Sequence, residues 1–152
     1  MRYLALIYSD ETAQPASPEE GKAAMDRWWG YTNDLQKSGV MLAGEALQPT
    51  DTATTVRFSD GGTLVNDGPY TETKEQLGGF YMYECENLDQ AIEWASKMPV
   101  GPGSSIELRP VMELGDYRPE PYAPGGSVPS RSEAQPRGRL HLLKYALMLY
   151  VD

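Results

Sequence analysis

The apolar positions of the chain fall into short segments separated by turn-forming residues, a pattern typical of β-strands. Residues 2–8 are apolar at both parities, as in a strand covered on both faces, and residues 80–84 repeat this feature. The sequence predicts further strands at residues 40–43 with a bend at Gly44, at 52–58 and 63–66 joined by the turn 59–62, and at 106–112. Pro110 in the last segment predicts a strand at a sheet edge.

A long amphipathic helix is predicted from Pro18 to Ser38. Ser17 and Glu20 form a capping box, with Pro18 at the first helical position. Gly39 supplies the left-handed residue that ends the helix. The apolar positions follow the i, i+3, i+4 spacing of one buried stripe, which consists of Met25, Trp28, Trp29, Thr32 and Leu35.

Two shorter helices are also predicted. Asn87 caps a helix that Pro99 ends. The buried stripe of that helix consists of Leu88, Ala91, Ile92, Ala95 and Met98. A second capping box, from Thr73 to Gln76, predicts a helical piece of one or two turns within a loop, which Gly78 and Gly79 end.

The order of these elements is β-α-β, a hairpin, then β-α-β, which predicts a ferredoxin-like α+β fold (βαββαβ) with an inserted hairpin. Two helices cover only one face of such a sheet, yet residues 2–8 and 80–84 are apolar on both sides. A second subunit that packs sheet to sheet would cover the other face. The alternative is a monomer with an aromatic-rich exposed face, which monomers rarely tolerate.

The composition changes after residue 116. Residues 1–116 form the predicted domain, and residues 117–139 form a Pro- and Gly-rich linker arm. Residues 140–152 are strongly apolar and resemble the first strand. One interpretation is that this segment adds a strand to a neighbouring sheet edge. The other is that it begins a second, truncated copy of the domain.

Composition and charge exclude several classes of protein. The chain has 13 Lys and Arg against 22 Asp and Glu, a net charge of -9, so we expect no nucleic-acid partner. No apolar stretch approaches the roughly 20 residues of a membrane-spanning helix, and no secretory leader is expected. Cys85 is the single cysteine, which excludes an internal disulfide and is typical of a cytoplasmic protein.

The segment Asp67-Gly-Pro-Tyr70, continued by residues 71–80, resembles the signature of the DGPF branch of the YCII-related family. Residues 40–45 and the first strand resemble that branch too, and the match covers about residues 1–114. The resemblance implies a dimeric α+β barrel with a cleft near the interface. More distant members are associated with a His–Asp pair whose His lies on the first helix.

That acid–base pair is not transferred to this chain. Trp28 and Trp29 stand where the first helix would present the histidine. The one histidine, His141, lies in the C-terminal tail, where a surface residue is the more common role.

A candidate site follows from the signature segment. Asp67 is the predicted catalytic residue, because a carboxylate desolvated beside like charges becomes a general base. Glu72, Lys74 and Glu75 add two carboxylates and an amine. The alternatives are structural: Asp67 would shape a turn through backbone N–H groups, and the other three would be a solvated face of the short helix.

Aromatic residues provide the second part of the predicted site. Rings able to line a cleft for a flat organic ligand belong to Trp28, Trp29, Tyr31, Tyr70, Tyr81 and Tyr83. Tyr70, Lys74, Glu72, Trp28, Trp29 and Tyr81 are the predicted substrate contacts. The alternative interpretation places these rings in the core and in a dimer interface.

Two functional hypotheses remain open at this point. The first is a homodimeric small-molecule binder or a small lyase or hydrolase-type enzyme with an aromatic cleft, which needs no cofactor or metal. The second is a non-enzymatic regulatory or interaction module, because DGPF proteins resemble partners encoded beside alternative sigma factors. No phosphate loop, nucleophile elbow, metal spacing or dinucleotide fingerprint is present in the sequence.

Overall fold

The computed structural model describes residues 1–13 and 15–113. The expected linker 117–139, the apolar segment 140–152 and His141 lie outside the described residues. The elements in chain order are β1 (Arg2–Ser9), α1 (Pro18–Ser38), β2 (Met41–Ala46), the 3-10 turn η1 (Thr50–Thr52), β3 (Thr54–Ser59), β4 (Gly62–Asp67), β5 (Gln76–Glu84), α2 (Leu88–Ser96) and β6 (Ser105–Pro110).

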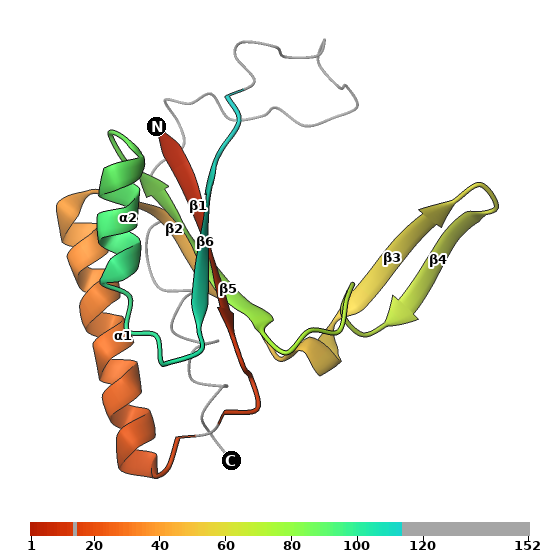
Figure 1. The fold of residues 1–152 in the computed structure, drawn as a ribbon, viewed down its shortest axis with the longest axis horizontal. Coiled ribbons are helices and arrows are strands. Elements are labelled where there is room, and N and C mark those ends of the chain that lie inside the picture. Colours follow the sequence, from red (N-terminus) through yellow and green to blue (C-terminus); the bar gives the residue numbers. More distant parts are fainter. Residues whose placement is uncertain (14, 114–152) are drawn as a thin grey trace, which may run out of the picture.

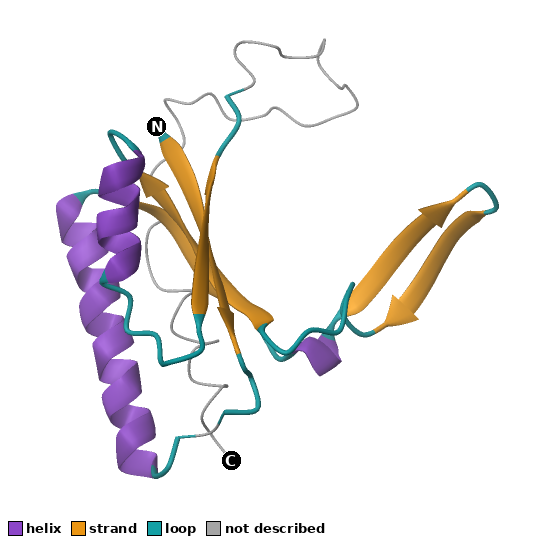
Figure 2. Ribbon diagram, in the orientation of Figure 1, coloured by secondary structure: helices purple, strands orange, loops and turns teal. Residues whose placement is uncertain are grey.

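The main sheet has four antiparallel strands in the order β2-β5-β1-β6. Both helices cover the same face of this sheet, and no helix of the described residues lies on the other face (Figures 1 and 2). The βαββαβ order and this strand arrangement confirm the predicted ferredoxin-like α+β fold with an inserted hairpin. β6, which ends at Pro110, is an edge strand as predicted.

Helix α1 has the predicted bounds because both of its ends carry local signals. The Glu20 backbone N–H donates to Ser17 Oγ (3.2 Å), and the Glu20 carboxylate accepts from the Ala16 N–H (2.9 Å). Gly39 takes the left-handed conformation (φ 74°) and ends the helix. Tyr31, which the predicted stripe omits, is buried beside Thr32 and Leu35, whereas Met25, Trp28 and Trp29 are half-buried.

Helix α2 begins at the predicted cap, where Asn87 Oδ1 accepts from the Gln90 N–H (3.0 Å). The predicted buried stripe is partly wrong. Ala91, Ala95 and the following Met98 are buried, but Leu88 and Ile92 are 47% and 46% exposed. The side of the helix that packs on the core runs through Ala91, Trp94, Ala95 and Met98, so Leu88 and Ile92 lie to one side of it and face solvent.

The predicted short helix at 73–76 is wrong, because strand β5 already begins at Gln76. Gln76 Nε2 donates to the Thr73 carbonyl (2.6 Å), and the Thr73 hydroxyl donates to the Glu75 carbonyl (2.5 Å), so no helical cap forms. Gly78 and Gly79 lie within β5 rather than in a turn. A Cβ on Gly79 would lie 2.7 Å from the Glu45 carbonyl oxygen, so glycine permits the close approach of β2.

The bend predicted at Gly44 lies elsewhere in β2. The register between β2 and β5 shifts between Met41 and Ala43, which places the irregularity at Leu42. Gly44 continues the strand instead. A Cβ on Gly44 would lie 2.5 Å from Cδ1 of Tyr81, so its missing side chain leaves room for that ring.

One face of the main sheet is covered by the two helices, and the other face is not. Tyr3, Ala5, Tyr81 and Tyr83 point to the helices and are buried. The side facing away from the helices, here called the open face, carries the paired residues Leu4 and Met82, Leu6 and Phe80, and Tyr8 and Leu77. All six are half-buried.

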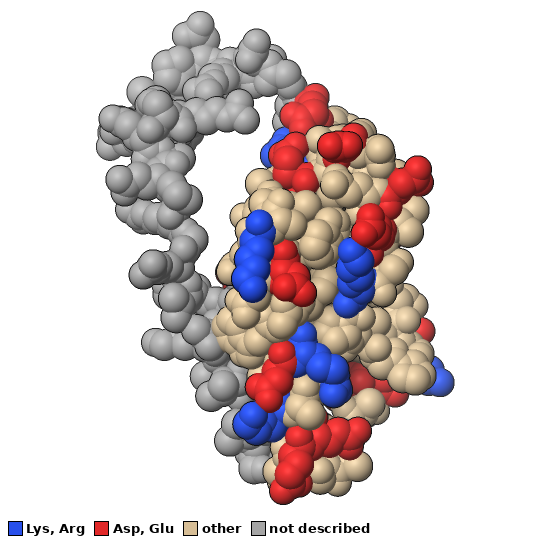
Figure 3. All heavy atoms as spheres, turned by 90° about the vertical axis from the view of Figure 1, so that its left-hand side faces the viewer, with Lys and Arg blue, Asp and Glu red and all other residues tan. Residues whose placement is uncertain are grey.

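The helix-covered side of the molecule has a solvated outer surface. Lys, Arg, Asp and Glu are interspersed over it (Figure 3). Ion pairs one helical turn apart join Lys22 to Asp26 (2.7 Å) and Lys97 to Glu93 (2.6 Å). Within the described residues no helix is both long and apolar enough to cross a membrane.

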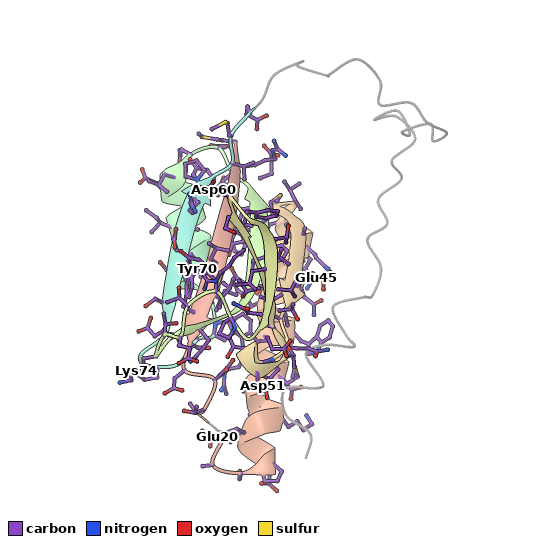
Figure 4. All side chains as sticks on the ribbon, turned by 90° about the vertical axis from the view of Figure 1, so that its right-hand side faces the viewer. Glu20, Glu45, Asp51, Asp60, Tyr70 and Lys74 are labelled. Carbon is purple, nitrogen blue, oxygen red and sulfur yellow. The ribbon has the colours of Figure 1, made fainter. Side chains whose placement is uncertain are left out.

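Strands β3 and β4 form a separate two-stranded sheet, here called the arm. The arm leaves one end of the main sheet and projects to the side opposite the helices (Figure 1). Its tip carries Asp60, and Tyr70 follows its base (Figure 4).

Candidate functional site

Four of the predicted aromatic residues form one cluster between α1 and the sheet, here called the aromatic cluster: Trp28, Tyr31, Tyr81 and Tyr83. Trp28 stacks on Tyr81 with ring centroids 6.5 Å apart, and Tyr81 stacks on Tyr83 at 6.4 Å. Tyr31 meets Tyr81 edge to face at 5.5 Å. These offset and T-shaped contacts are the geometries that aromatic pairs prefer in a protein core.

The tyrosine hydroxyls of the cluster are hydrogen-bonded to one another and to the helices. The hydroxyls of Tyr31 and Tyr83 lie 2.6 Å apart, and Tyr31 also donates to the Trp94 carbonyl (3.0 Å). The Tyr81 hydroxyl pairs with Thr32 Oγ1 at 2.7 Å. No buried polar side-chain atom among the described residues lacks a partner. These contacts give the hydroxyls a structural role.

Burial raises the pKa of Tyr31, Tyr81 and Tyr83 above the usual 10.0, because the phenolate form loses its solvation. For Tyr83 the hydrogen bond with Tyr31 raises the pKa further, while for Tyr81 the hydrogen bond with Thr32 opposes the rise. The cluster is therefore uncharged at neutral pH and holds no base.

The predicted ligand contacts Trp28, Trp29 and Tyr81 thus lie on the helix side of the sheet. Trp28 and Trp29 are half-buried, and Tyr81 is 5% exposed with its hydroxyl engaged by Thr32. A role of these rings in ligand binding stays a prediction.

The other predicted site residues lie around the base of the arm. Asp67 is the last residue of β4 and is exposed. Tyr70 is 75% exposed, and Glu72 and Lys74 follow it in the loop that leads to β5, as the stick view shows for Tyr70 and Lys74 (Figure 4). Within residues 1–13 and 15–113, no hydrogen bond, ion pair or ring contact joins this group to the aromatic cluster.

Tyr70 is held by one residue of the arm. Arg57 Nη2 donates to the Tyr70 carbonyl (2.9 Å), and the Arg57 guanidinium lies 5.4 Å from the centre of the Tyr70 ring. An arginine above a tyrosine face is a cation–π contact. It fixes the position of the ring although the ring stays accessible.

The turn after Asp67 is shaped by the backbone. Gly68 has φ 104°, its N–H donates to the Ala53 carbonyl (2.7 Å), and its carbonyl accepts from Thr55 Oγ1 (2.8 Å). The Asp67 carboxylate accepts no hydrogen bond from any residue that the structure describes. The turn-shaping role considered for its side chain is therefore not observed, and the carboxylate faces solvent.

A polar junction that the sequence analysis missed joins three segments at one end of the sheet. The Glu11 carboxylate accepts from the N–H (3.0 Å) and the hydroxyl of Thr50, and the Glu11 N–H donates to Gln76 Oε1 (3.2 Å). Hydrogen bonds from Thr12 lower the pKa of Asp10, and the nearby Lys74 ammonium lowers it slightly more. Because these residues come from distant segments, no local pattern marks them.

Cys85 follows β5 and is buried, as is common for a free cysteine, which packs like a small apolar residue. Burial raises the pKa of its thiol. No group of three metal-ligating residues is found in the described part of the chain.

Comparisons with known proteins show the family to which the chain belongs. The YCII-related domain matches residues 1–115. The chain is also 38% identical, over 133 residues, to the uncharacterized protein R00369 of Rhizobium meliloti (strain 1021). The match covers 86% of this chain and all of that relative. The chain is therefore a member of the YCII-related domain family.

Proposed function

We propose that the chain works as a homodimer, in which the open faces of two sheets pack together, and that it binds a small aromatic ligand near this interface. The observation that supports the dimer best is the distribution of side chains on the open face. The central part of its two inner strands, Leu4 to Tyr8 and Leu77 to Met82, carries only apolar or aromatic residues there. Charged residues surround this centre: Arg2 and Glu84 at one end of the inner strands, and Glu45, Glu107 and Arg109 on the outer strands. An apolar centre with a charged rim is the usual anatomy of a protein interface.

The register of the strands gives this pattern in two rows across the sheet. One row runs Glu45, Phe80, Leu6 and Glu107, and the next runs Ala43, Met82, Leu4 and Arg109. In a twofold dimer the same patch meets itself, so the apolar centres of both copies coincide. Two facing sheets pack about 10 Å apart, which suits side chains of this size.

Sedimentation equilibrium tests the dimer. We expect a particle of twice the 16.8 kDa chain mass at micromolar concentration. Leu6→Lys places a charge in the centre of the open face and should yield monomers. Leu88→Lys is the matched control, since Leu88 is 47% exposed on α2, away from the open face. A wild-type monomer at that concentration contradicts the proposal.

The proposed ligand site lies at the base of the arm. Tyr70 offers an exposed, positioned ring for stacking, and Lys74 offers an ammonium for an anionic or polar substituent. Asp67 is exposed in the single chain, and it would become a base for proton transfer where a bound ligand desolvates its carboxylate. Glu72 lies in the same loop. A flat phenolic or quinone-like compound has the chemistry that these groups recognise.

A thermal-shift screen with phenolic and quinone-like compounds tests this site. We expect a hit whose shift is lost in Tyr70→Ala and Lys74→Gln but kept in Lys22→Gln, a control on α1. If the shift is lost instead in Trp28→Phe and kept in Tyr70→Ala, the ligand binds at the aromatic cluster and the site at the base of the arm is wrong. Turnover of a hit that Asp67→Asn abolishes, without loss of binding, would identify an enzyme.

The second candidate is a non-enzymatic interaction module, in keeping with the DGPF branch, which stays a prediction. The observation that favours it is the internal pairing of the cluster hydroxyls, which bind one another and Thr32 inside the core. A pull-down with purified alternative sigma factor, using the full chain and a chain ended at Asp116, distinguishes the candidates. Only the module predicts capture, and the apolar tail would strengthen it.

A further inference from the structure

We infer that the arm is a clasp: in the dimer proposed above, on which this inference rests, the apolar face of β3–β4 packs on the second copy of the chain. Packing of the two open faces would cover the apolar surface of the main sheet but not the apolar side chains of the arm. These side chains therefore need a covering surface as well.

The ladder of the arm separates its residues by face. Directly paired residues share a face, so one side carries the pairs Val56 with Val65, Phe58 with Thr63 and Thr54 with Asp67. Arg57, Leu64, Thr55 and Asn66 lie on the other side. The first side, here called the clasp face, is apolar or hydroxylated except for Asp67 at the base.

The clasp face is open to solvent within one chain. Phe58 is 84% exposed, Val65 61% and Val56 48%. A lone two-stranded hairpin is marginal in water, and it gains stability when a hydrophobic face packs against another element. Contiguous exposed apolar side chains of this kind mark interaction sites.

Hydrogen bonds fix the base of the arm, whereas the rest of the arm projects away from the main sheet. The Gly68 N–H donates a hydrogen bond to the Ala53 carbonyl, and the Thr55 hydroxyl donates to the Gly68 carbonyl. The Arg57 guanidinium donates to the Tyr70 carbonyl. These contacts set the direction in which the arm leaves the domain. A rigid base reduces the entropy lost when the arm docks, which favours docking on a surface at a set position.

The arm's direction identifies the second copy as the occupant. The arm projects away from the helices, on the side of the open face (Figure 1), and Figure 4 views the molecule from that side. A second copy that packs on the open face would occupy that same side. The clasp face then continues the interface of the sheet.

Charge supports the same occupant. Each chain carries a net charge of -9, so two copies repel unless they meet on neutral surfaces. Apart from Asp67, the clasp face carries no charged residue, whereas the helix-covered side carries many (Figure 3). The clasp face is thus a surface on which two copies meet without placing acidic groups together.

The experiment compares dimer dissociation constants by sedimentation. The double variant Phe58→Ser with Val65→Ser should raise the constant at least about tenfold and still dimerise at high concentration. Leu64→Ser is the matched control on the other side of the arm, where Leu64 is 56% exposed, and should change the constant less than about threefold. Circular dichroism confirms that the variants fold.

A photo-crosslinking residue at position 58 gives an independent measurement on the full chain. We expect a covalent dimer whose crosslink maps to the partner copy. An unchanged constant in the double variant, or a crosslink only to residues 140–152 of the same chain, overturns the clasp while the dimer stands. A monomeric wild type overturns the proposed dimer itself.

Discussion

The hydroxyl of Tyr31 on α1 lies 2.6 Å from the hydroxyl of Tyr83 on β5, and Tyr83 is fully buried. Tyr31 also donates to the Trp94 carbonyl of α2, so one side chain links both helices to the sheet. A paired polar contact inside an apolar core fixes the position of the elements it joins. The Tyr31–Tyr83 pair thus fixes the position in which the two helices pack on the sheet.

The two tyrosines of this pair should respond differently to loss of the hydroxyl. Tyr83→Phe leaves Tyr31 its bond to Trp94 and should lower the free energy of unfolding by about 0.5–1.5 kcal/mol. Tyr31→Phe strands the Tyr83 hydroxyl in the core and should cost about 1–3 kcal/mol. Urea unfolding at one protein concentration measures both values. A larger loss in Tyr83→Phe contradicts this account.

The free energy of unfolding should fall as the pH rises above about 10. The raised pKa values of Tyr31, Tyr81 and Tyr83 keep these groups protonated in the fold, whereas in the unfolded chain they ionise at their usual value. The unfolded state then binds fewer protons, so alkali favours it, and the contribution of these tyrosines to stability is fully present below that pH. Each tyrosine contributes a slope of at most about 1.4 kcal/mol per pH unit.

Urea midpoints between about pH 8 and about pH 11 measure this slope. Tyr83→Phe should flatten it, because one protonated phenol is lost from the core. Tyr70→Phe, at a residue that is 75% exposed, should leave it unchanged. Equal slopes in all three proteins would show that groups outside the cluster, such as the buried Cys85 thiol, govern the alkaline transition.

Gly79 should tolerate alanine far less than Gly78. At Gly79 the new methyl group would lie 2.7 Å from the Glu45 carbonyl oxygen, which forces β2 and β5 apart and should cost about 1–3 kcal/mol. At Gly78 the nearest atom is Ser9 Oγ at 3.8 Å, so the cost should stay within about 0.5 kcal/mol. Thermal or urea unfolding of the two variants compares them directly. Equal costs would contradict the close approach of β2 and β5 at Gly79.

Arg57→Ala should loosen the loop 68–75. This substitution removes the hydrogen bond to the Tyr70 carbonyl and the contact with the Tyr70 ring. Local opening then costs about 0.5–1 kcal/mol less, so amide exchange in the loop should be about two- to fivefold faster. Lys22→Ala, which removes the exposed ion pair with Asp26 on α1 and touches no part of the loop, serves as the control. Unchanged exchange in Arg57→Ala would mean that the backbone bonds of Gly68 hold the loop.

The sequence predicted elements whose boundaries carry local signals. Both ends of α1 were predicted correctly because Ser17, Glu20 and Gly39 act within one turn of the helix they bound. The start of β5 was predicted wrongly because the same kind of signal at Thr73 and Gln76 was used for other hydrogen bonds. The close approach of β2 to Gly79 could not be predicted from a local pattern, because it involves Glu45, which lies more than thirty residues earlier in the chain.

The candidate site was predicted in composition but not in arrangement. Trp28, Tyr31, Tyr81 and Tyr83 were selected as aromatic residues and do form one cluster. The sequence could not show that the Tyr31 and Tyr83 hydroxyls pair, because this depends on how α1 packs against β5. It could also not show that Tyr70 lies away from the cluster, in a loop whose position Arg57 of the arm fixes.

The place of β1 in the sheet has a consequence for synthesis of the chain. β1 is made well before its two neighbours, β5 and β6, which begin at Gln76 and Ser105. At about 5–20 residues per second, the apolar strand waits several seconds on the ribosome for any pairing partner. Folding dominated by such distant pairings is slow, so the apolar side chains of β1 stay uncovered on the nascent chain until its neighbours have been made.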